Sequence, residues 1–326
     1  MSDIIFNDKN EVIDLKDKNQ ADFKSLAKNN KLSEKFILEN ADLLDWSIIS
    51  ENQALTVKII VTCLKKIYWG IISNNSNLDD DQKIVAKYKG NLIALVKKEK
   101  NKAYFLRTYS ELFDWEKLSK QKNLSEDFMR EFQDKVHWGK IVVHQMLSES
   151  LIKEFQDKFD RDKWAWGDIS HFQILSESFI REFQNKISWE NISQYQVLSE
   201  IFMKEFQDKI HWDKISQYQI LSENFIEECQ DRVQWHNISA YQKLSYEFVC
   251  KFKDKIQWFN FSYYQKLSEK FMKEFQDKIE WYVIPEHQTL SEDFMREFEQ
   301  KLDWKILFEK QKMSAKFIEE FKHKIQ

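Results

Sequence analysis

The sequence repeats itself every 23 residues, and this period limits the possible folds more than any other feature of the chain. Most units open with a Leu, which we number repeat position 1, and carry a Trp at position 15; Asn101 and Met313 at position 1 and Leu92 at position 15 are exceptions. Two independent markers that keep one frame indicate an array of short units instead of a domain with a single core. Position 1 is occupied by Leu124, Leu147, Leu175, Leu198, Leu221, Leu244, Leu267, Leu290 and Met313. The Trp markers are Trp46, Trp69, Trp115, Trp138, Trp166, Trp189, Trp212, Trp235, Trp258, Trp281 and Trp304.

The frame extends toward the N-terminus and divides one continuous array into four parts. Counting back from Leu124 in steps of 23 places position 1 at Asn101, Leu78, Leu55 and Leu32. The step from Leu147 to Leu175 is 28 residues, so five extra residues lie near 160–164. We therefore expect an N-terminal cap or degenerate repeat at 1–31, divergent repeats at 32–123, regular repeats at 124–312 and a capping helix at 313–326.

Each unit has the pattern of two short helices. Positions 5, 6, 9 and 13 are apolar, and position 2 is almost always a Ser that can cap a helix, which predicts a first helix over positions 3–13. Within that helix, Glu205 and Lys209 have the i,i+4 spacing of an ion pair. The Trp segment predicts a second, shorter helix. Where Pro285 occupies this segment, the regular part should begin late or open with a 3₁₀ turn.

Composition favours helices over strands. Only 4 Gly and 1 Pro occur in 326 residues, so the turn residues that many short strands need are scarce. A helix pair of this size cannot bury its own Leu, Phe, Trp and Ile side chains and must stack on its neighbours. We therefore predict an all-α fold, an α-solenoid of stacked helix-turn-helix repeats of about 23 residues.

Charge and cysteine content exclude several settings. The formal net charge is −4 with both signs interspersed, so no global positive field attracts nucleic acid or an anionic membrane. No apolar run reaches the ~18 residues of a membrane span, and the N-terminal residues do not resemble a secretion signal. Cys63 and Cys229 stand at position 9, where most repeats carry Phe, and with Cys250 they are interpreted as reduced thiols. We expect an intracellular protein that is not secreted.

The sequence contains no recognisable catalytic or metal site. The His residues are scattered over the repeat without ligand spacing, the recurring Ser is explained by capping, and 4 Gly cannot build a phosphate loop. We expect no enzymatic activity, no cofactor and no metal.

A binding site is more readily expected where the repeats differ from one another. Positions 16 and 20 are mostly polar and should face solvent, but they hold aromatic side chains at Phe259, Tyr263 and Tyr282, which we predict to form one exposed patch. The insertion either bends the array, the interpretation we favour, or presents Trp164 to a partner.

Two features keep other functions open. Tyr at position 21 and Gln at position 22 form a regular series that either hydrogen-bonds between repeats, the interpretation we favour, or stacks on bases as modular RNA readers do. A lysine-rich stretch is either a solvated helix face, again favoured, or a basic patch for nucleic acid. The candidate basic residues are Lys87, Lys89, Lys97, Lys98, Lys100, Lys102 and Arg107.

The repeat phrase is similar to a known kind of protein. The stretches Trp212–Val233 and Trp258–Ile279 follow W-x-x-I-S-x-Y-Q-x-L-S-E-x-F-x-x-E-F-x-D-K-I almost throughout. This phrase resembles tandem-repeat proteins of giant DNA viruses of the mimivirus type. The resemblance implies a viral protein that acts on host factors in the host cytoplasm, and it brings no catalytic residues with it.

The functional expectation follows from these points. We expect a non-enzymatic protein-protein interaction scaffold, a viral protein that binds a host factor, and a monomer in preference to an oligomer. The alternative is a nucleic-acid-binding helical repeat array, although nucleic acid is the less expected partner. A structural, self-associating viral component is the second alternative.

Overall fold

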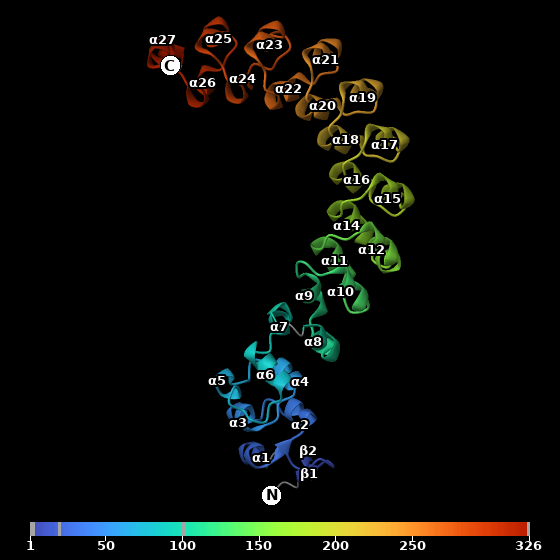
Figure 1. Ribbon diagram of the computed structural model, residues 1–326. Helices are drawn as coiled ribbons and strands as arrows, with labels where there is room; N and C mark the ends of the chain where they lie inside the picture. The colour runs from blue at the N-terminus through green and yellow to red at the C-terminus, as the bar shows by residue number, and fades with distance from the viewer. Residues whose placement is uncertain (1–3, 19–20, 99–101, 325–326) are drawn as a thin grey trace. The chain divides into compact units, whose positions relative to one another are not determined.

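The computed structural model describes residues 4–18, 21–98 and 102–324, and these are mostly helical (Figure 1). The chain divides into two compact units. Unit 1 comprises Met1–Gln121 and Phe132–His137, and unit 2 comprises Lys122–Glu131 and Trp138–Gln326. No described helix is both long enough and apolar enough to cross a membrane.

Unit 1 begins with a three-stranded sheet that the all-α prediction missed. Strand β2 (Glu11–Leu15) pairs antiparallel with β1 (Ile4–Phe6) and parallel with β3 (Lys31–Leu32). The prediction was wrong here because it looked for Gly or Pro in turns, and this turn is built from asparagines. Asn10 adopts a positive φ of 57°, and the side-chain oxygen of Asn7 accepts hydrogen bonds from the backbone N–H groups of Lys9 and Glu11.

The rest of unit 1 is helical and follows the repeat frame loosely. Helix α1 begins at Phe23, α3 at Trp46, α5 at Trp69 and α9 at Trp115. The second helix of each of these repeats therefore starts at the marker Trp or at the residue in its place. The helices are α1 (Phe23–Asn29), α2 (Glu34–Glu39), α3 (Trp46–Asn52), α4 (Val57–Thr62), α5 (Trp69–Ile72), α6 (Asp80–Lys87), α7 (Leu92–Lys98), α8 (Lys102–Thr108), η1 (Ser110–Leu112) and α9 (Trp115–Ser119).

Unit 2 contains the regular repeats, arranged as two rows of helices. First helices α15, α17, α19, α21, α23 and α25 form one row, and second helices α16, α18, α20, α22, α24 and α26 form the other, with each second helix packed on the next (Figure 1). The elements are α10 (Glu126–Glu131), α11 (Trp138–His144), α12 (Glu149–Glu154), α13 (Gln156–Asp160), α14 (Ala165–Phe172), α15 (Glu177–Glu182), α16 (Trp189–Tyr195), α17 (Glu200–Glu205), α18 (Trp212–Tyr218), α19 (Glu223–Glu228), α20 (Trp235–Tyr241), α21 (Tyr246–Lys251), α22 (Trp258–Tyr264), α23 (Glu269–Glu274), α24 (Ile284–His287), α25 (Glu292–Glu297), α26 (Trp304–Lys310), α27 (Ala315–Phe321) and η2 (Lys322–Lys324).

The first helix of each regular repeat is shorter than the sequence predicts. Helix α17 ends at Glu205, position 8, because Phe206 leaves the helical conformation with φ −107° and ψ 27°. The carbonyl of Phe206 then accepts the N–H groups of Lys209 and Ile210, which closes a turn and brings Ile210 into the core. Position 13 is therefore buried by a turn and not by a continuing helix.

The predicted pairing of Glu205 with Lys209 is wrong for the same reason. Glu205 instead binds Arg181 of the preceding repeat, with 2.8 Å between guanidinium nitrogen and carboxylate oxygen. Lys209 donates to the side-chain oxygen of Gln184, also in the preceding repeat. Such exposed pairs contribute little each, but they run between repeats and not along one helix.

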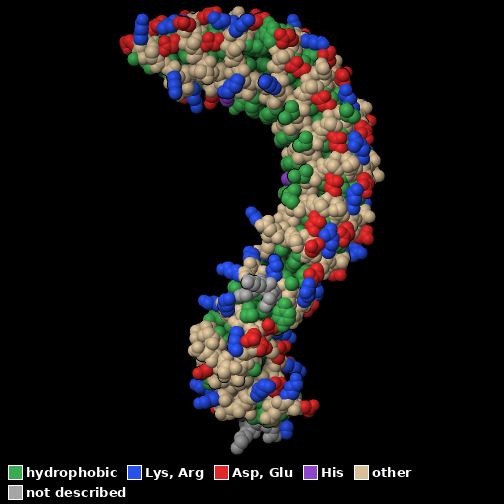
Figure 2. All heavy atoms as spheres, viewed as in Figure 1, with side chains coloured by type: hydrophobic (Ala, Val, Ile, Leu, Met, Phe, Trp, Pro, Cys, Tyr) green, Lys and Arg blue, Asp and Glu red, His purple; other side chains and the backbone are tan. Residues whose placement is uncertain are grey.

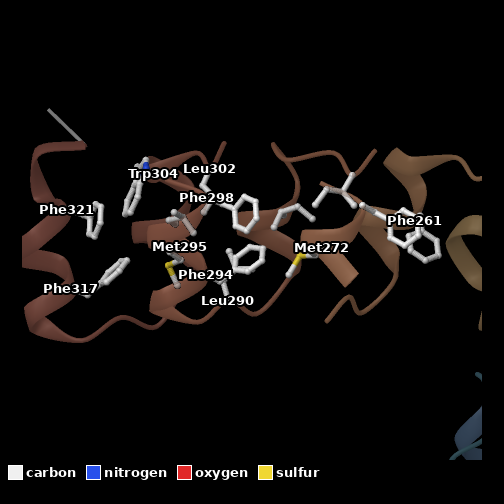
Figure 3. Close-up of a cluster of buried hydrophobic side chains, with 14 of the residues drawn as sticks. Phe261, Met272, Leu290, Phe294, Met295, Phe298, Leu302, Trp304, Phe317 and Phe321 are labelled. Carbon is white, nitrogen blue, oxygen red and sulfur yellow. The ribbon is translucent and has the colours of Figure 1, made fainter. Parts of the chain in front are cut away.

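Stacked aromatic rings form the core between repeats. The Trp at position 15 packs on the Phe at position 9 of the next repeat, as in Trp189 with Phe206, whose ring centroids lie 5.0 Å apart. The last such pair is Trp304 with Phe321, where the rings lie 4.5 Å apart and nearly parallel (Figure 3). Each repeat thus completes the core of its neighbour, as expected for units too small to fold alone.

Pro285 has the predicted local effect. Helix α24 covers only Ile284–His287, whereas its equivalent α22 begins at the marker Trp258. Residues Trp281–Val283 form a turn ahead of α24. The regular part of this second helix therefore begins late, as a Pro in the segment predicts.

Candidate functional site

The Gln at position 22 joins each regular repeat to the one before it. The side-chain oxygen of Gln219 accepts the backbone N–H of Leu198 at 3.2 Å, and its side-chain nitrogen donates to the carbonyls of Ser193 and Gln196 at 3.1 and 2.7 Å. Gln173, Gln196, Gln242 and Gln288 make the same three contacts with their own neighbours. These buried side chains are part of the scaffold.

Tyr at position 21 lies differently from its Gln neighbour. Tyr195, Tyr218, Tyr241 and Tyr264 are close to half exposed, although they recur as regularly as the Gln residues. The predicted Tyr/Gln series therefore separates into a buried bonding row and an exposed aromatic row. Recognition of nucleic-acid bases by this series would need both side chains. The polar atoms of the Gln are already hydrogen-bonded within the protein, so the Gln is not available for this role.

The residue at position 23 is forced outward by the backbone. Gln219 is extended, with φ −87° and ψ 150°, and both Gln219 and Leu221 point into the core. Successive side chains of an extended chain point to opposite sides, so Ile220 between them must face solvent. Its exposed fraction is 96%, and that of Val197 one repeat earlier is 93%.

Four successive repeats place an apolar side chain at this outward position. We call Met146, Ile174, Val197 and Ile220 the aliphatic row, and all four are exposed. The fold does not require apolar residues there, because the following repeats carry Lys243 and Lys266 at the same position. An exposed apolar row that packing does not explain is a common mark of an interaction surface. The sequence showed these residues, but the helical period did not tell which side they face.

The predicted aromatic patch is present and larger than expected. The rings of Phe259 and Tyr263 lie 5.9 Å apart, and those of Phe259 and Tyr282 lie 6.0 Å apart. Tyr263 also contacts Tyr264 at 4.7 Å, and Tyr264 contacts Tyr241 at 5.4 Å. These five exposed rings form one surface, which we call the aromatic cluster.

The surroundings of the aromatic cluster are mildly basic. His287 lies against Tyr263 with 3.8 Å between ring centroids, and the exposed Lys243 and Lys266 follow Tyr241 and Tyr264 by two residues. Tyr241 raises the pKa of the Tyr264 phenol, so this ring carries no charge near neutral pH.

Hydrophobic side chains also gather along the edge of α14, α16 and α18 (Figure 2).

Trp164 is exposed in the five-residue insertion. Its exposed fraction is 70%, and Lys163 lies over its ring with the ammonium 5.0 Å from the centroid. The insertion adds the short helix α13 and lets Asp160 accept the indole N–H of Trp166 at 2.8 Å. Trp164 is thus presented to solvent while Trp166 keeps the core place.

The candidate basic residues lie on three elements of unit 1. Lys87 ends α6 and Lys89 follows it, Lys97 and Lys98 end α7, and Lys102 and Arg107 lie on α8. All six are exposed, and Lys100 falls outside the described residues. Among these candidates, Lys87 and Lys89 line a common pocket in the described part of unit 1, together with Trp69.

The described residues contain no group of three or more His, Cys, Asp or Glu side chains placed to hold a metal ion. Some of the polar groups with altered pKa values lie at the joints between repeats. A hydrogen bond from Ser148, for example, lowers the pKa of Glu126. No family model, no curated protein and no solved structure matches the chain.

Proposed function

We propose that the protein is an α-solenoid of 23-residue helical hairpins that binds other proteins without catalysing a reaction. The observation that carries this proposal is the aromatic cluster, a contiguous set of five exposed rings, three of which stand at positions where most other repeats carry polar residues. Large rigid aromatic side chains supply much of the binding energy in protein interfaces.

The partner that suits this surface has an apolar face flanked by acidic residues. The aliphatic row offers contacts for apolar side chains along several repeats, and Lys243 and Lys266 carry positive charge where that row ends. The resemblance of the repeat phrase to giant-virus repeat proteins supports a viral protein in the host cytoplasm with a host factor as partner. We propose that the protein binds this partner as a monomer.

Binding of a purified partner to matched variants tests this proposal. We expect a partner recovered with the wild-type protein to bind the triple variant Phe259→Ser, Tyr263→Ser, Tyr282→Ser at least about tenfold more weakly, because hot-spot aromatics each contribute more than about 1 kcal/mol. The matched control is Ile201→Ser, which removes an exposed apolar side chain on the first-helix α17.

Two further outcomes would favour other interpretations. Undiminished binding by a folded triple variant would show that the aromatic cluster is not the site. Tight binding of single-stranded RNA or DNA oligonucleotides at low salt, lost on raising the salt, would favour the nucleic-acid-binding alternative.

A further inference from the structure

Unit 1 contains a pocket beside Trp69, at the start of α5. The pocket has a volume of about 490 Å³ and is lined by Trp69, Ile72, Ser73, Leu78, Lys83, Ala86, Lys87 and Lys89. Its size lies within the range of small-molecule sites. It combines an apolar wall with three lysines, and no carboxylate is among its lining residues.

The repeat frame explains why the pocket exists. In regular repeats a Phe at position 9 fills the space against the preceding Trp, as Phe252 does on Trp235 and Phe298 on Trp281, at centroid distances of 5.4 and 4.9 Å. The repeat that follows Trp69 has Ala86 at this position. The pocket therefore occupies the place of a missing aromatic ring.

Trp69 retains the groups that a flat ligand would use. Among the described residues no aromatic ring stacks on it, and its indole N–H has no hydrogen-bond partner, whereas that of Trp212 donates to the carbonyl of Gln207 at 2.9 Å. The ring face of Trp69 is thus open to a flat ligand in the place of the Phe, and its indole N–H can donate a hydrogen bond to that ligand.

The lysines define the rest of the ligand. Position 12 is a Lys that lies over the preceding Trp in regular repeats, as Lys301 does over Trp281 at 5.2 Å, and Lys89 keeps this position beside Trp69. Lys83 adds a second ammonium group at position 6, where regular repeats carry an apolar core residue. Neither Lys83 nor Lys89 has an ion-pair partner among the described residues. Cations over an aromatic wall favour a ligand that is both flat and negatively charged.

We propose that this pocket binds a small molecule that joins a flat aromatic ring to an anionic group, the chemistry of a nucleoside monophosphate. The ring stacks on Trp69 in the place that Phe takes in the regular repeats, and the anion meets Lys83 and Lys89. This site is independent of the protein-binding surface in unit 2.

Calorimetric titration of the full chain with AMP, adenosine and inorganic phosphate tests the proposal. We expect AMP to bind and each half of the molecule to bind at least about tenfold more weakly, because charge-assisted hydrogen bonds and stacking both contribute. Failure of AMP to bind would overturn the proposal, and equal affinity for adenosine would overturn the role of the lysines.

Variants show whether the binding occurs in this pocket. Ala86→Phe restores the ring of the regular repeats and should abolish AMP binding, while Ala86→Ser, which leaves the space open, should retain it. Lys83→Gln should weaken binding several-fold, and Lys65→Gln, which changes a lysine of the neighbouring repeat outside this pocket, should not. If Ala86→Phe does not fold, loss of binding in Trp69→Leu replaces it as the test. Unchanged affinity in a folded Ala86→Phe or Trp69→Leu variant would overturn the site.

Discussion

At the scale of single residues, Gln217 and Gln219 lie two positions apart on α18 and its C-terminal extension, yet they have different structural roles. Gln219 is buried and makes three hydrogen bonds, two to carbonyls of the preceding repeat and one to the N–H of Leu198 at the start of its own repeat, whereas no hydrogen bond of the Gln217 side chain is seen in the described structure. Replacing each Gln in turn therefore separates the stability that comes from the hydrogen bonds between repeats from the effect of removing any polar side chain.

We predict that Gln219→Leu lowers the free energy of unfolding by about 3 kcal/mol. The change leaves one buried N–H and two buried carbonyls without a partner, and each such loss costs about 1–3 kcal/mol. Gln217→Leu is the matched control and should change stability by less than about 0.5 kcal/mol. Urea unfolding followed by circular dichroism measures both, and equal losses in the two variants would contradict the role of the Gln row.

Residue roles could be predicted only in part from the sequence. The Ser caps were predictable because a hydroxyl before an amphipathic stretch has one main use, and Ser222 indeed accepts the N–H of Phe225 at 3.1 Å. Tyr218 and Gln219 recur with the same regularity, so the period could not tell which faces the next repeat and which faces solvent. The backbone conformation at position 22 decides this, and a linear pattern does not contain it.

At the scale of elements, the Ser at position 19 connects consecutive second helices. The hydroxyl of Ser239 donates to the carbonyl of Trp235 at 2.7 Å and accepts the N–H of Gln257, in the next repeat, at 2.9 Å. Pro285 takes this position in α24 and lacks the hydroxyl. Helix α24 therefore lacks the bond within the helix and the bond to the next repeat that Ser193 makes in α16 and Ser239 makes in α20.

We predict that Pro285→Ser extends α24 toward Trp281 and raises the free energy of unfolding by about 1 kcal/mol. The new hydroxyl can make both missing bonds, worth about 1 kcal/mol each, and the greater freedom of the unfolded chain offsets part of this gain. Amide hydrogen exchange should show slower exchange at Asp303, the counterpart of Gln257. Ser239→Ala is the reciprocal control and should destabilise. Unchanged exchange at Asp303 would contradict the account.

The helix lengths illustrate what sequence periodicity leaves open. Apolar residues at positions 9 and 13 fit a continuing helix, and the prediction of a first helix over positions 3–13 followed from that spacing. In α17 the turn after Phe206 satisfies the same spacing. Both backbones bury the same side chains, and contact with the adjacent repeats selects the turn.

At the scale of the whole molecule, carboxylates at two joints between repeats are expected to make stability depend on pH. Glu292 accepts hydrogen bonds from Ser314 of the next repeat, which lowers its pKa, and Ser148 lowers that of Glu126. A carboxyl whose pKa is lower in the folded state than in the unfolded state stabilises the fold above the unfolded value. Protonation removes that contribution.

We predict that stability is constant near neutral pH and falls as the pH drops below about 4.5, the ordinary value for Glu, through the lowered folded-state values. The double variant Glu126→Gln, Glu292→Gln cannot titrate at these positions and should lose less stability between about pH 5 and pH 3. Urea midpoints across this range measure the difference. Parallel pH profiles for the two proteins would contradict the prediction.

The sequence predicts the architecture of the array better than its ends and irregular parts. The markers at Trp189 and Trp212 define units that the structure shows as stacked helix pairs, because every unit must bury the same residues. The strands around Val12 were missed because their turn is built from asparagines and not from Gly or Pro. The pocket beside Trp69 was missed because it depends on the absence of a side chain at Ala86, which becomes visible only when the neighbouring repeats show what normally fills that space.

The Gln joints also bear on how such a gene can evolve. Each joint pairs a residue with its counterpart exactly one unit earlier, as Gln219 pairs with the carbonyl of Gln196. Unequal recombination between neighbouring copies removes or duplicates a whole unit and leaves the same donors and acceptors on both sides of the new junction. The coding sequence can thus lengthen or shorten in steps of one repeat and keep every Gln joint paired.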